Sequence, residues 1–306
     1  MDFGRVPAAQ LYNIDFTLPR QTYLQRQVLP NAPAIHPQIH IGTTTWNHAD
    51  WVGKLFPGNT KEKDFLRNYT QHFNCVELNA THYKIYQHST IEKWIQQVNA
   101  PSFVFCPKMY QGISHFGHLS NKQALTQQFL QSIYALGQYL GPVFIQFSEH
   151  LAPTRQAELF AFLQQLPKHL VFFVEFRHPQ WYAVPAITEQ LAHFLYSEQI
   201  GWVITDTAGK RNCVHTQLTV PKSFVRFVAN DGHATDFVRL QAWAQQLHEW
   251  MQQGLQDAYF FIHTQQLSCI PELAHYLATQ LQQFGYPSIP LNVPPPQHPI
   301  QQGSLF

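Results

Sequence analysis

The feature that most constrains the fold of this chain is a regular alternation of short apolar segments with amphipathic ones. Eight β-rich apolar runs follow one another, beginning at Ile39, Cys75, Phe103, Val143, Val171, Trp202, Phe224 and Tyr259. Stretches with apolar residues at helical spacing lie between most of them, at 62–73, 90–98, 122–140, 154–166, 186–198 and 236–253. Strands that alternate with helices predict an α/β fold with a parallel sheet, and eight such units in about 250 residues predict a (β/α)8, TIM-barrel-like architecture.

One connection departs from this pattern. The segment 207–223 contains no convincing helical periodicity, so the crossover helix between the sixth and seventh strands is expected to be weak or missing. A doubly wound open sheet is the alternative, but it would usually have fewer units and a glycine-rich first turn. The first turn here, 42–46, reads Gly-Thr-Thr-Thr-Trp and matches neither glycine-rich phosphate-binding motif.

Proline positions suggest where the domain begins and ends. Five prolines interrupt residues 1–38, which we interpret as an N-terminal lead-in segment. Residues 39–286 are predicted to form a single barrel-like domain. Residues 287–306 are rich in proline and glutamine and are expected to form an extended tail.

Composition limits the classes of partner. Only 12% of the 306 residues are charged and the formal net charge is +1, so a general attraction to nucleic acid or to an anionic membrane is not expected. No apolar run is long enough to span a bilayer, and no signal peptide is evident. The four cysteines are far apart and form no CxxC pair, so we expect a reducing, cytoplasmic location. Separately, we expect a monomer.

Polar side chains recur at the C-terminal ends of the predicted strands. They are Glu77 and Asn79, Lys108, Gln146, Glu175 and Arg177, Asp206, Arg226, and His263, on the second to eighth strands in turn. The C-terminal ends of barrel strands converge on the face that holds active sites. Buried charges are unfavourable unless they are paired or bind a ligand. These residues therefore predict a polar site, although each could instead be part of an ion pair that closes the barrel interior.

Three further residues are weaker candidates because of where they lie. His178 directly follows Arg177, and we expect it to form hydrogen bonds. Trp46 and Trp181 follow strand ends, where each would either line the pocket or pack in the core. No metal site is predicted, because pairs such as His36 and His40 arise readily by chance among 18 histidines.

Several of these segments together resemble a known family. Residues 175–181 read Glu-Phe-Arg-His-Pro-Gln-Trp and resemble the EFRHPxW signature of the DUF72 family of YecE-like proteins. Supporting segments lie in family order at 41–46, 76–83, 103–108, 140–146 and 259–261. The resemblance implies a TIM-barrel-like fold and adds Tyr83, at the end of one such segment, to the candidate ligand-binding residues. It implies no activity.

The last strand departs from the pattern of many relatives. Where they carry an Asn-rich end after the aromatic run, residues 261–265 read Phe-Ile-His-Thr-Gln. Ligand contacts at this edge are therefore expected to differ.

The favoured hypothesis is an enzyme, either a hydrolase or an isomerase, that acts on a small polar, anionic or sugar-like substrate. Arg177 and Arg226 would clamp a carboxylate or a phosphate. Glu175 or Glu77 would act as general acid or base, tuned by burial and by Lys108. Asp206 would orient one of the two glutamates, and no cofactor is expected.

Two alternatives remain open at this point. One is a non-catalytic protein that binds a metabolite in the same pocket. The other is a metal-dependent phosphodiesterase or nuclease with Glu77, Glu175, Asp206 and His263 as ligands of a divalent metal.

Overall fold

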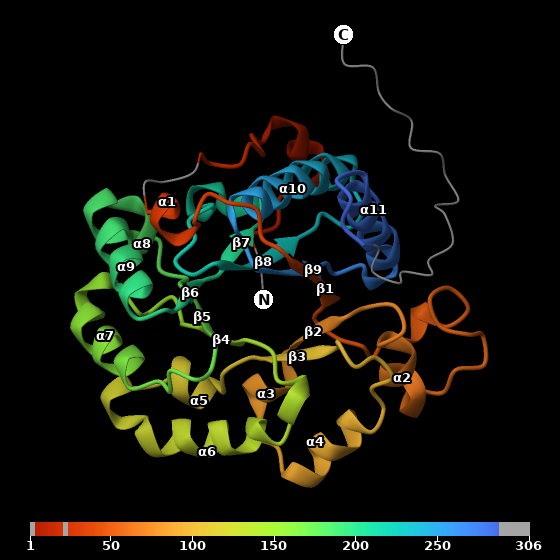
Figure 1. The fold of residues 1–306 in the computed structure, drawn as a ribbon, viewed down its shortest axis with the longest axis horizontal. Coiled ribbons are helices and arrows are strands. Elements are labelled where there is room, and N and C mark those ends of the chain that lie inside the picture. The colour runs from red at the N-terminus through yellow and green to blue at the C-terminus, as the bar shows by residue number, and fades with distance from the viewer. Residues whose placement is uncertain (1–3, 21–23, 288–306) are drawn as a thin grey trace.

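The computed structural model of the protein describes residues 4–20 and 24–287 (Figure 1). Its strands are β1 Gln38–Thr43, β2 Cys75–Leu78, β3 Val104–Pro107, β4 Val143–Gln146, β5 Phe172–Glu175, β6 Gly201–Trp202, β7 Ile204–Asp206, β8 Lys222–Val228 and β9 Asp257–His263. All eight predicted apolar runs are strands, and the sixth is divided at Val203 into β6 and β7.

The strands pair in parallel and form two sheets. One has six strands in the order β3-β2-β1-β9-β8-β7, and the other has three in the order β4-β5-β6. Between β3 of the first sheet and β4 of the second, the described residues form just two isolated parallel bridges, Phe105 with Leu140 and Lys108 with Phe144. The fold is therefore α/β with a six-stranded parallel central sheet, and closure of all the strands into one barrel is not shown by this pairing.

Helices lie around the outside of the strands (Figure 1). The α-helices are α1 Gln25–Val28, α2 Phe65–Tyr69, α3 Ala80–Tyr83, α4 His88–Ile95, α5 Gln111–Ser114, α6 Gln123–Tyr134, α7 Gln156–Gln164, α8 Gln180–Ala183, α9 Pro185–Ser197, α10 Ala234–Gln253 and α11 Ile270–Gln283. Each predicted helical segment overlaps one of them, whereas α11 and the four-residue helices α1, α3, α5 and α8 were not predicted. Between β7 and β8 there is only the 3-10 helix η7, Ala208–Cys213, which confirms the weak crossover.

Two positions show why the backbone takes this path. Gly42 lies where β1 meets β2, and a Cβ there would come within 2.2 Å of the Cys75 carbonyl oxygen. Helix α10 ends at Gly254, which has a φ of 113° and lets the chain turn toward β9. A side chain at Gly254 would also meet Pro30 of the lead-in segment, so both glycines are required by space or by backbone conformation.

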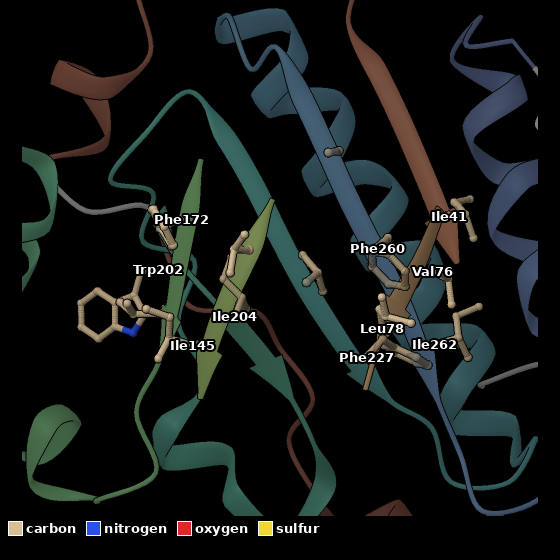
Figure 2. Close-up of a cluster of buried hydrophobic side chains, with 14 of the residues drawn as sticks. Ile41, Val76, Leu78, Ile145, Phe172, Trp202, Ile204, Phe227, Phe260 and Ile262 are labelled. Atoms are coloured by element: carbon tan, nitrogen blue, oxygen red, sulfur yellow. The ribbon is translucent and has the colours of Figure 1, made fainter. Parts of the chain in front are cut away.

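Side chains form two apolar layers because successive strand residues point to opposite faces. The outer layer packs against the helices and includes Ile41, Val76, Ile145, Ile204 and Phe260 (Figure 2). A separate inner apolar cluster comprises Cys75, Cys106, Phe144, Phe173, Val203, Val220, Phe224, Tyr259 and Phe261. The Phe224 ring lies 5.2 Å from that of Phe144 and 5.3 Å from that of Phe173, so the two sheets face each other across this inner cluster.

The lead-in segment packs on the domain. Leu11, Leu24 and Leu29 are buried, and the amide of Gly209 donates to the carbonyl of Gly4 at 2.7 Å. Residues 288–306, which hold almost all of the predicted tail, lie outside the described residues. Among the residues described, no helix is long and apolar enough to cross a membrane.

Candidate functional site

The polar residues at the strand ends form a layer directly above the inner apolar cluster. On strand after strand, a buried apolar residue is followed two positions later by a polar one on the same face. The pairs are Cys75 and Glu77, Cys106 and Lys108, Phe144 and Gln146, Phe173 and Glu175, Val203 and Thr205, Phe224 and Arg226, and Phe261 and His263. This spacing places the polar group of each strand at the C-terminal side of the inner cluster.

Arg226 lies at the centre of this polar layer. Its Nε and Nη2 donate to the two carboxylate oxygens of Glu77 at 2.9 and 3.0 Å. Its Nη1 donates to Oε2 of Glu175 at 2.7 Å. All three side chains are buried, so a single guanidinium lies between two carboxylates and reduces the repulsion between them in this apolar interior.

The hydrogen-bonded network continues from Glu175 to Lys108. Gln146 Nε2 donates to Glu175 Oε2 at 2.8 Å, and Lys108 Nζ donates to Gln146 Oε1 at 3.1 Å. The other oxygen of Glu175 accepts from Thr205 Oγ1 at 2.9 Å and forms an ion pair with Arg177 Nη2 at 2.8 Å. Glu175 is therefore held by four neighbours, of which two are arginines.

Glu77 is held on its other side by neutral groups. Asn79 Nδ2 donates to Glu77 Oε1 at 2.9 Å, and His263 Nε2 lies 3.0 Å from Glu77 Oε2. An ionised carboxylate can only accept hydrogen bonds, so the His263 proton resides on Nε2. The structure thus brings most of the predicted residues into one network.

The pKa values of these groups limit what each can do. Burial acts to raise the pKa of Glu175, but Arg177 and Arg226 outweigh it and bring the pKa to about 2. For Glu77, burial is likewise outweighed, by Arg226 and His263, and the pKa lies well below the usual range. Both carboxylates are therefore ionised and weakly basic at neutral pH, which disfavours their predicted role as general acid or base.

Lys108 behaves in the opposite way. Burial lowers its pKa, the nearby charge of Arg226 lowers it further, and the resulting pKa is about 8. Burial also lowers the pKa of His263, although Glu77 acts against the shift. Of the groups in the network, Lys108 is thus one that can exchange a proton near neutral pH.

A cavity of about 440 Å³ opens at this layer. It is lined by Arg5, Thr44, Asn79, Tyr83, Lys108, Arg226, Val228, Ala229, His263, Thr264 and Gln265. Three of these residues are cationic and none is acidic, because Glu77 and Glu175 lie behind Arg226. Asn79, Tyr83, Lys108, Arg226 and His263 were predicted from sequence.

The remaining lining residues were not predicted. Arg5 comes from the lead-in segment and pairs with Asp231 at 2.6 Å. Thr264 and Gln265 follow β9, where Asp231 Oδ1 accepts from the Thr264 hydroxyl at 2.7 Å and from the Gln265 amide at 3.1 Å. The departure from the family pattern at 261–265 was a usable signal for the last two, whereas no local pattern points to Arg5.

Two histidines near Lys108 were also missed as site residues. The rings of His82 and His115 lie 4.8 Å apart, and the His82 ring contacts the Met109 carbonyl through Nδ1 at 2.8 Å. Burial, followed by the charge of Lys108, lowers the pKa of each to about 4. Both imidazoles are therefore neutral at physiological pH.

Asp206 does not join the network. Its carboxylate accepts hydrogen bonds from Arg211, from Arg239 at 3.3 Å and from Trp243 Nε1 at 2.8 Å. In β7 the side chain of Thr205 points inward to the network, so the side chain of Asp206 points to the opposite face, toward α10. No hydrogen bond joins it to either glutamate, and this placement corrects the prediction that Asp206 orients one of them.

Three other predicted residues also lie away from the cavity. Trp181 is fully buried, donates to the Leu151 carbonyl at 2.7 Å and belongs to the outer core, so it does not wall the pocket. Trp46 is half-buried and its ring lies 5.8 Å from that of Trp94. His178 Nδ1 accepts from the Gln180 amide at 3.3 Å.

The described residues contain no group of three His, Cys, Asp or Glu side chains arranged to hold a metal ion. The carboxylate oxygens of Glu77 and Glu175 instead face arginines. A metal at this position would have to compete with Arg226 for both carboxylates.

Known proteins similar to this chain agree on one family. The profile described as "Protein of unknown function DUF72" matches residues 40–298. The UPF0759 protein YecE of Escherichia coli, in strains K12 and O157:H7, is 30% identical over 291 residues, which cover 88% of this chain and 100% of YecE. The UPF0759 protein YunF of Bacillus subtilis is 30% identical over 177 residues, covering 54% of this chain and 58% of YunF.

A solved structure is similar in fold. The crystal structure of a DUF72 family protein from Enterococcus faecalis V583 superposes with a TM-score of 0.60 at 20% identity, covering 81% of this chain and 97% of that protein.

Proposed function

The chain belongs to the DUF72 family, whose description assigns no function, and from its site we propose that the protein binds a small anionic or sugar-like molecule in the 440 Å³ cavity and transforms it by acid–base chemistry. One observation carries the proposal. Among the described residues, the cavity is lined by three cationic side chains, Arg5, Lys108 and Arg226, and by no carboxylate. Such a cavity favours a ligand that brings its own negative charge.

The proposed chemistry depends on Lys108. Glu77 and Glu175 remain ionised at neutral pH, and their role is to hold Arg226 in place. Lys108 has a pKa of about 8, so its ammonium and amine forms both exist near neutral pH and it can donate or accept a proton. Hydrolases and isomerases are two enzyme classes that use such a group.

The proposal includes a barrel-like wall for the cavity. The amide of Met109 donates to the Phe144 carbonyl at 2.9 Å across the junction of β3 and β4. Only Val203 separates β6 from β7, and its amide donates to the Val174 carbonyl at 2.9 Å. These contacts support a barrel-like arrangement in which the two sheets together surround the inner apolar cluster, with interruptions at these two junctions.

The proposal is tested by binding of simple anions to the full chain. We expect inorganic phosphate or malonate to bind saturably in a calorimetric titration, with an affinity that falls as salt is added. Lys108→Met and Arg226→Met should weaken binding, whereas Lys84→Met, which removes an exposed lysine, should not. Absence of saturable binding by phosphate, malonate and simple sugars would overturn the proposal.

A second experiment separates an enzyme from a carrier. The purified protein is incubated with a metabolite extract, and mass spectrometry follows each compound that the protein retains. A retained compound that is chemically converted supports an enzyme. A retained compound that stays unchanged supports the alternative of a non-catalytic binding protein.

A further inference from the structure

The surroundings of Lys108 differ from those of an ordinary buried lysine. Lys108 directly follows β3, and its side chain is almost entirely buried although it borders the cavity. Its Nζ lies 5.7 Å from the centre of the Phe144 ring and donates to the amide oxygen of Gln146. The hydrogen-bond partner of this ammonium is therefore a neutral group.

No carboxylate in the described part of the chain forms an ion pair with Lys108. The two nearby candidates, Glu77 and Glu175, are bound by Arg226, and Glu175 is bound also by Arg177. Burial and the charges of Arg226 and Arg177 act against a proton on Nζ and outweigh Glu77 and Glu175, which favour it, so the pKa of Lys108 is lowered. A buried amine that lacks a counter-ion and lies next to fixed cations is the setting in which a lysine becomes a nucleophile.

We propose that Lys108 forms an imine with the carbonyl carbon of a small anionic ligand whose negative group is held beside Arg226. This inference rests on the proposed function and names its substrate class, which is an aldehyde or ketone that bears a carboxylate or a phosphate.

The reaction is balanced without an additional reagent. The amine of Lys108 attacks the carbonyl carbon, a C–N bond forms, and the carbonyl oxygen becomes a hydroxyl group. The proton that the ammonium released before the attack adds to this hydroxyl group, the C–O bond breaks, and the oxygen leaves as water. Overall, the lysine ammonium and the carbonyl compound give a protonated imine and one water molecule, so the net charge is unchanged.

The surrounding residues suit each stage of this reaction. The Gln146 carbonyl oxygen accepts from Nζ and fixes the direction of the amine. Asn79, Tyr83 and His263 line the same cavity and offer polar groups to the hydroxyl that forms on the ligand. The protonated imine restores the positive charge at Nζ, now next to an anion, where burial disfavours it less.

The experiment is reductive trapping on the full-length protein. Glyoxylate, a small aldehyde with one carboxylate, is added with cyanoborohydride, which reduces an imine to a stable carboxymethyl-lysine. Peptide mass spectrometry then locates and quantifies the modified lysines. We expect Lys108 to be labelled at least tenfold faster than the exposed Lys84, with labelling that rises through about pH 8.

Inorganic phosphate serves as the competitor, and Lys108→Arg and Lys84→Met serve as matched variants. Phosphate should slow labelling of Lys108 and not that of Lys84. Lys108→Arg should lose the fast site, and Lys84→Met should retain it. The comparison of Lys108 with Lys84 is made in the protein without substitutions, so it does not depend on whether Lys108→Arg folds.

The outcomes distinguish this inference from the proposed function. If phosphate binds saturably but Lys108 is labelled no faster than Lys84, the imine is wrong and the anion site stands. If Lys108 is labelled rapidly but phosphate gives no protection, the seating of the anion beside Arg226 is wrong. If neither binding nor fast labelling occurs, both proposals are overturned.

Discussion

Two buried arginines in this protein each lie between two carboxylates, yet their surroundings differ. Arg226 joins Glu77 to Glu175 and borders the cavity. Arg239 joins Asp206 to Asp236, with distances of 3.1 Å to each carboxylate. Both arginines are about 1% exposed. Burial of charge alone therefore does not separate a ligand site from a structural cluster.

The difference lies in how the protein satisfies each cluster. Arg239 also donates to the main-chain carbonyls of Val228 and Asp206 at 3.1 and 3.0 Å. Its guanidinium lies 4.2 Å from the centre of the Phe227 ring. Asp236 accepts the main-chain amides of Asn230 and Gly232 at the start of α10. This cluster is completed by protein groups and does not line the cavity.

The charge balance separates the two clusters further. In the charged group around Arg239, the outer cluster, Asp206 and Asp236 face Arg239 and Arg211, two carboxylates against two cations. In the charged group around Arg226, from here on the inner cluster, Glu77 and Glu175 face Arg226 and Arg177, and Lys108 adds one more cation. This inner cluster thus has an excess positive charge beside a cavity, which an anionic ligand would neutralise.

The largest expected effect is on the outer cluster. Arg239→Met leaves Asp206 and Asp236 without their shared cation in the interior, so the free energy of unfolding should fall by about 3–5 kcal/mol. Urea denaturation measures this loss. The fraction that remains folded should bind phosphate as the unchanged protein does.

Arg226→Met provides the contrasting result. It should lose a similar amount of stability, because Glu77 and Glu175 lose their shared cation, and it should also lose phosphate binding. If Arg239→Met abolished phosphate binding in protein that is still folded, the distinction between the two clusters would be wrong.

The second prediction uses the excess charge at Lys108. The unfolded lysine keeps its proton up to about pH 10.5, whereas the folded one releases it at about pH 8. The unfolded state therefore binds more protons at this residue between these values, and the contribution of Lys108 to stability rises with pH across this window. Lys108→Met lacks this titration. The free energy of unfolding of the variant, relative to that of the unchanged protein, should therefore fall by up to roughly 3 kcal/mol between about pH 7 and pH 10.5.

Urea midpoints at the two pH values measure this difference. The Met side chain leaves the Gln146 oxygen without its donor, so the absolute stability of the variant is shifted, but this shift is independent of pH. Lys84→Met, at an exposed lysine, should give a difference that does not change with pH. If the difference in stability between Lys108→Met and the unchanged protein does not vary with pH, the Lys108 ammonium is stabilised in the folded protein as well as in the unfolded one.

The third prediction compares the same chemical change in both clusters. Glu175→Gln removes a negative charge from behind Arg226 and should tighten phosphate binding about three- to tenfold. Asp206→Asn removes one from the outer cluster and should change the affinity less than about twofold. Titration calorimetry on folded protein compares the two. Equal effects of the two substitutions would mean that the charges of the outer and the inner cluster influence anion binding in the cavity equally.

The sequence predicted the inner cluster well where the alternation of residues along a strand showed which side chains share a face. In β5, Glu175 follows Phe173 on one face, and Arg177 follows two positions later, so the polar end of the strand was evident. In the sixth run, residues 202–206, both faces begin with apolar residues. A one-residue choice between Thr205 and Asp206 then decides which side chain points inward, and the charged residue was the wrong one.

Other misses have different causes. Helix α11 carries Leu273, Leu277 and Leu281 at helical spacing, so its signal was present in the sequence. Arg5 reaches the cavity through a contact with Asp231, which is 226 positions away along the chain. No local pattern encodes such a contact, and only the three-dimensional structure brings the lead-in segment to the site.

The smallest expected effect concerns Arg5, the cation that the lead-in segment adds to the cavity. Its pair with Asp231 is partly exposed and contributes well under about 1 kcal/mol to stability, so Arg5→Gln should leave the urea midpoint almost unchanged. Phosphate affinity should fall about two- to threefold at low salt, because one of three cations at the cavity is lost. The difference should vanish as ionic strength rises, since the side chain is reached by solvent. A loss that persists in high salt would place Arg5 in direct, desolvated contact with the anion and make the lead-in segment part of the inner cluster.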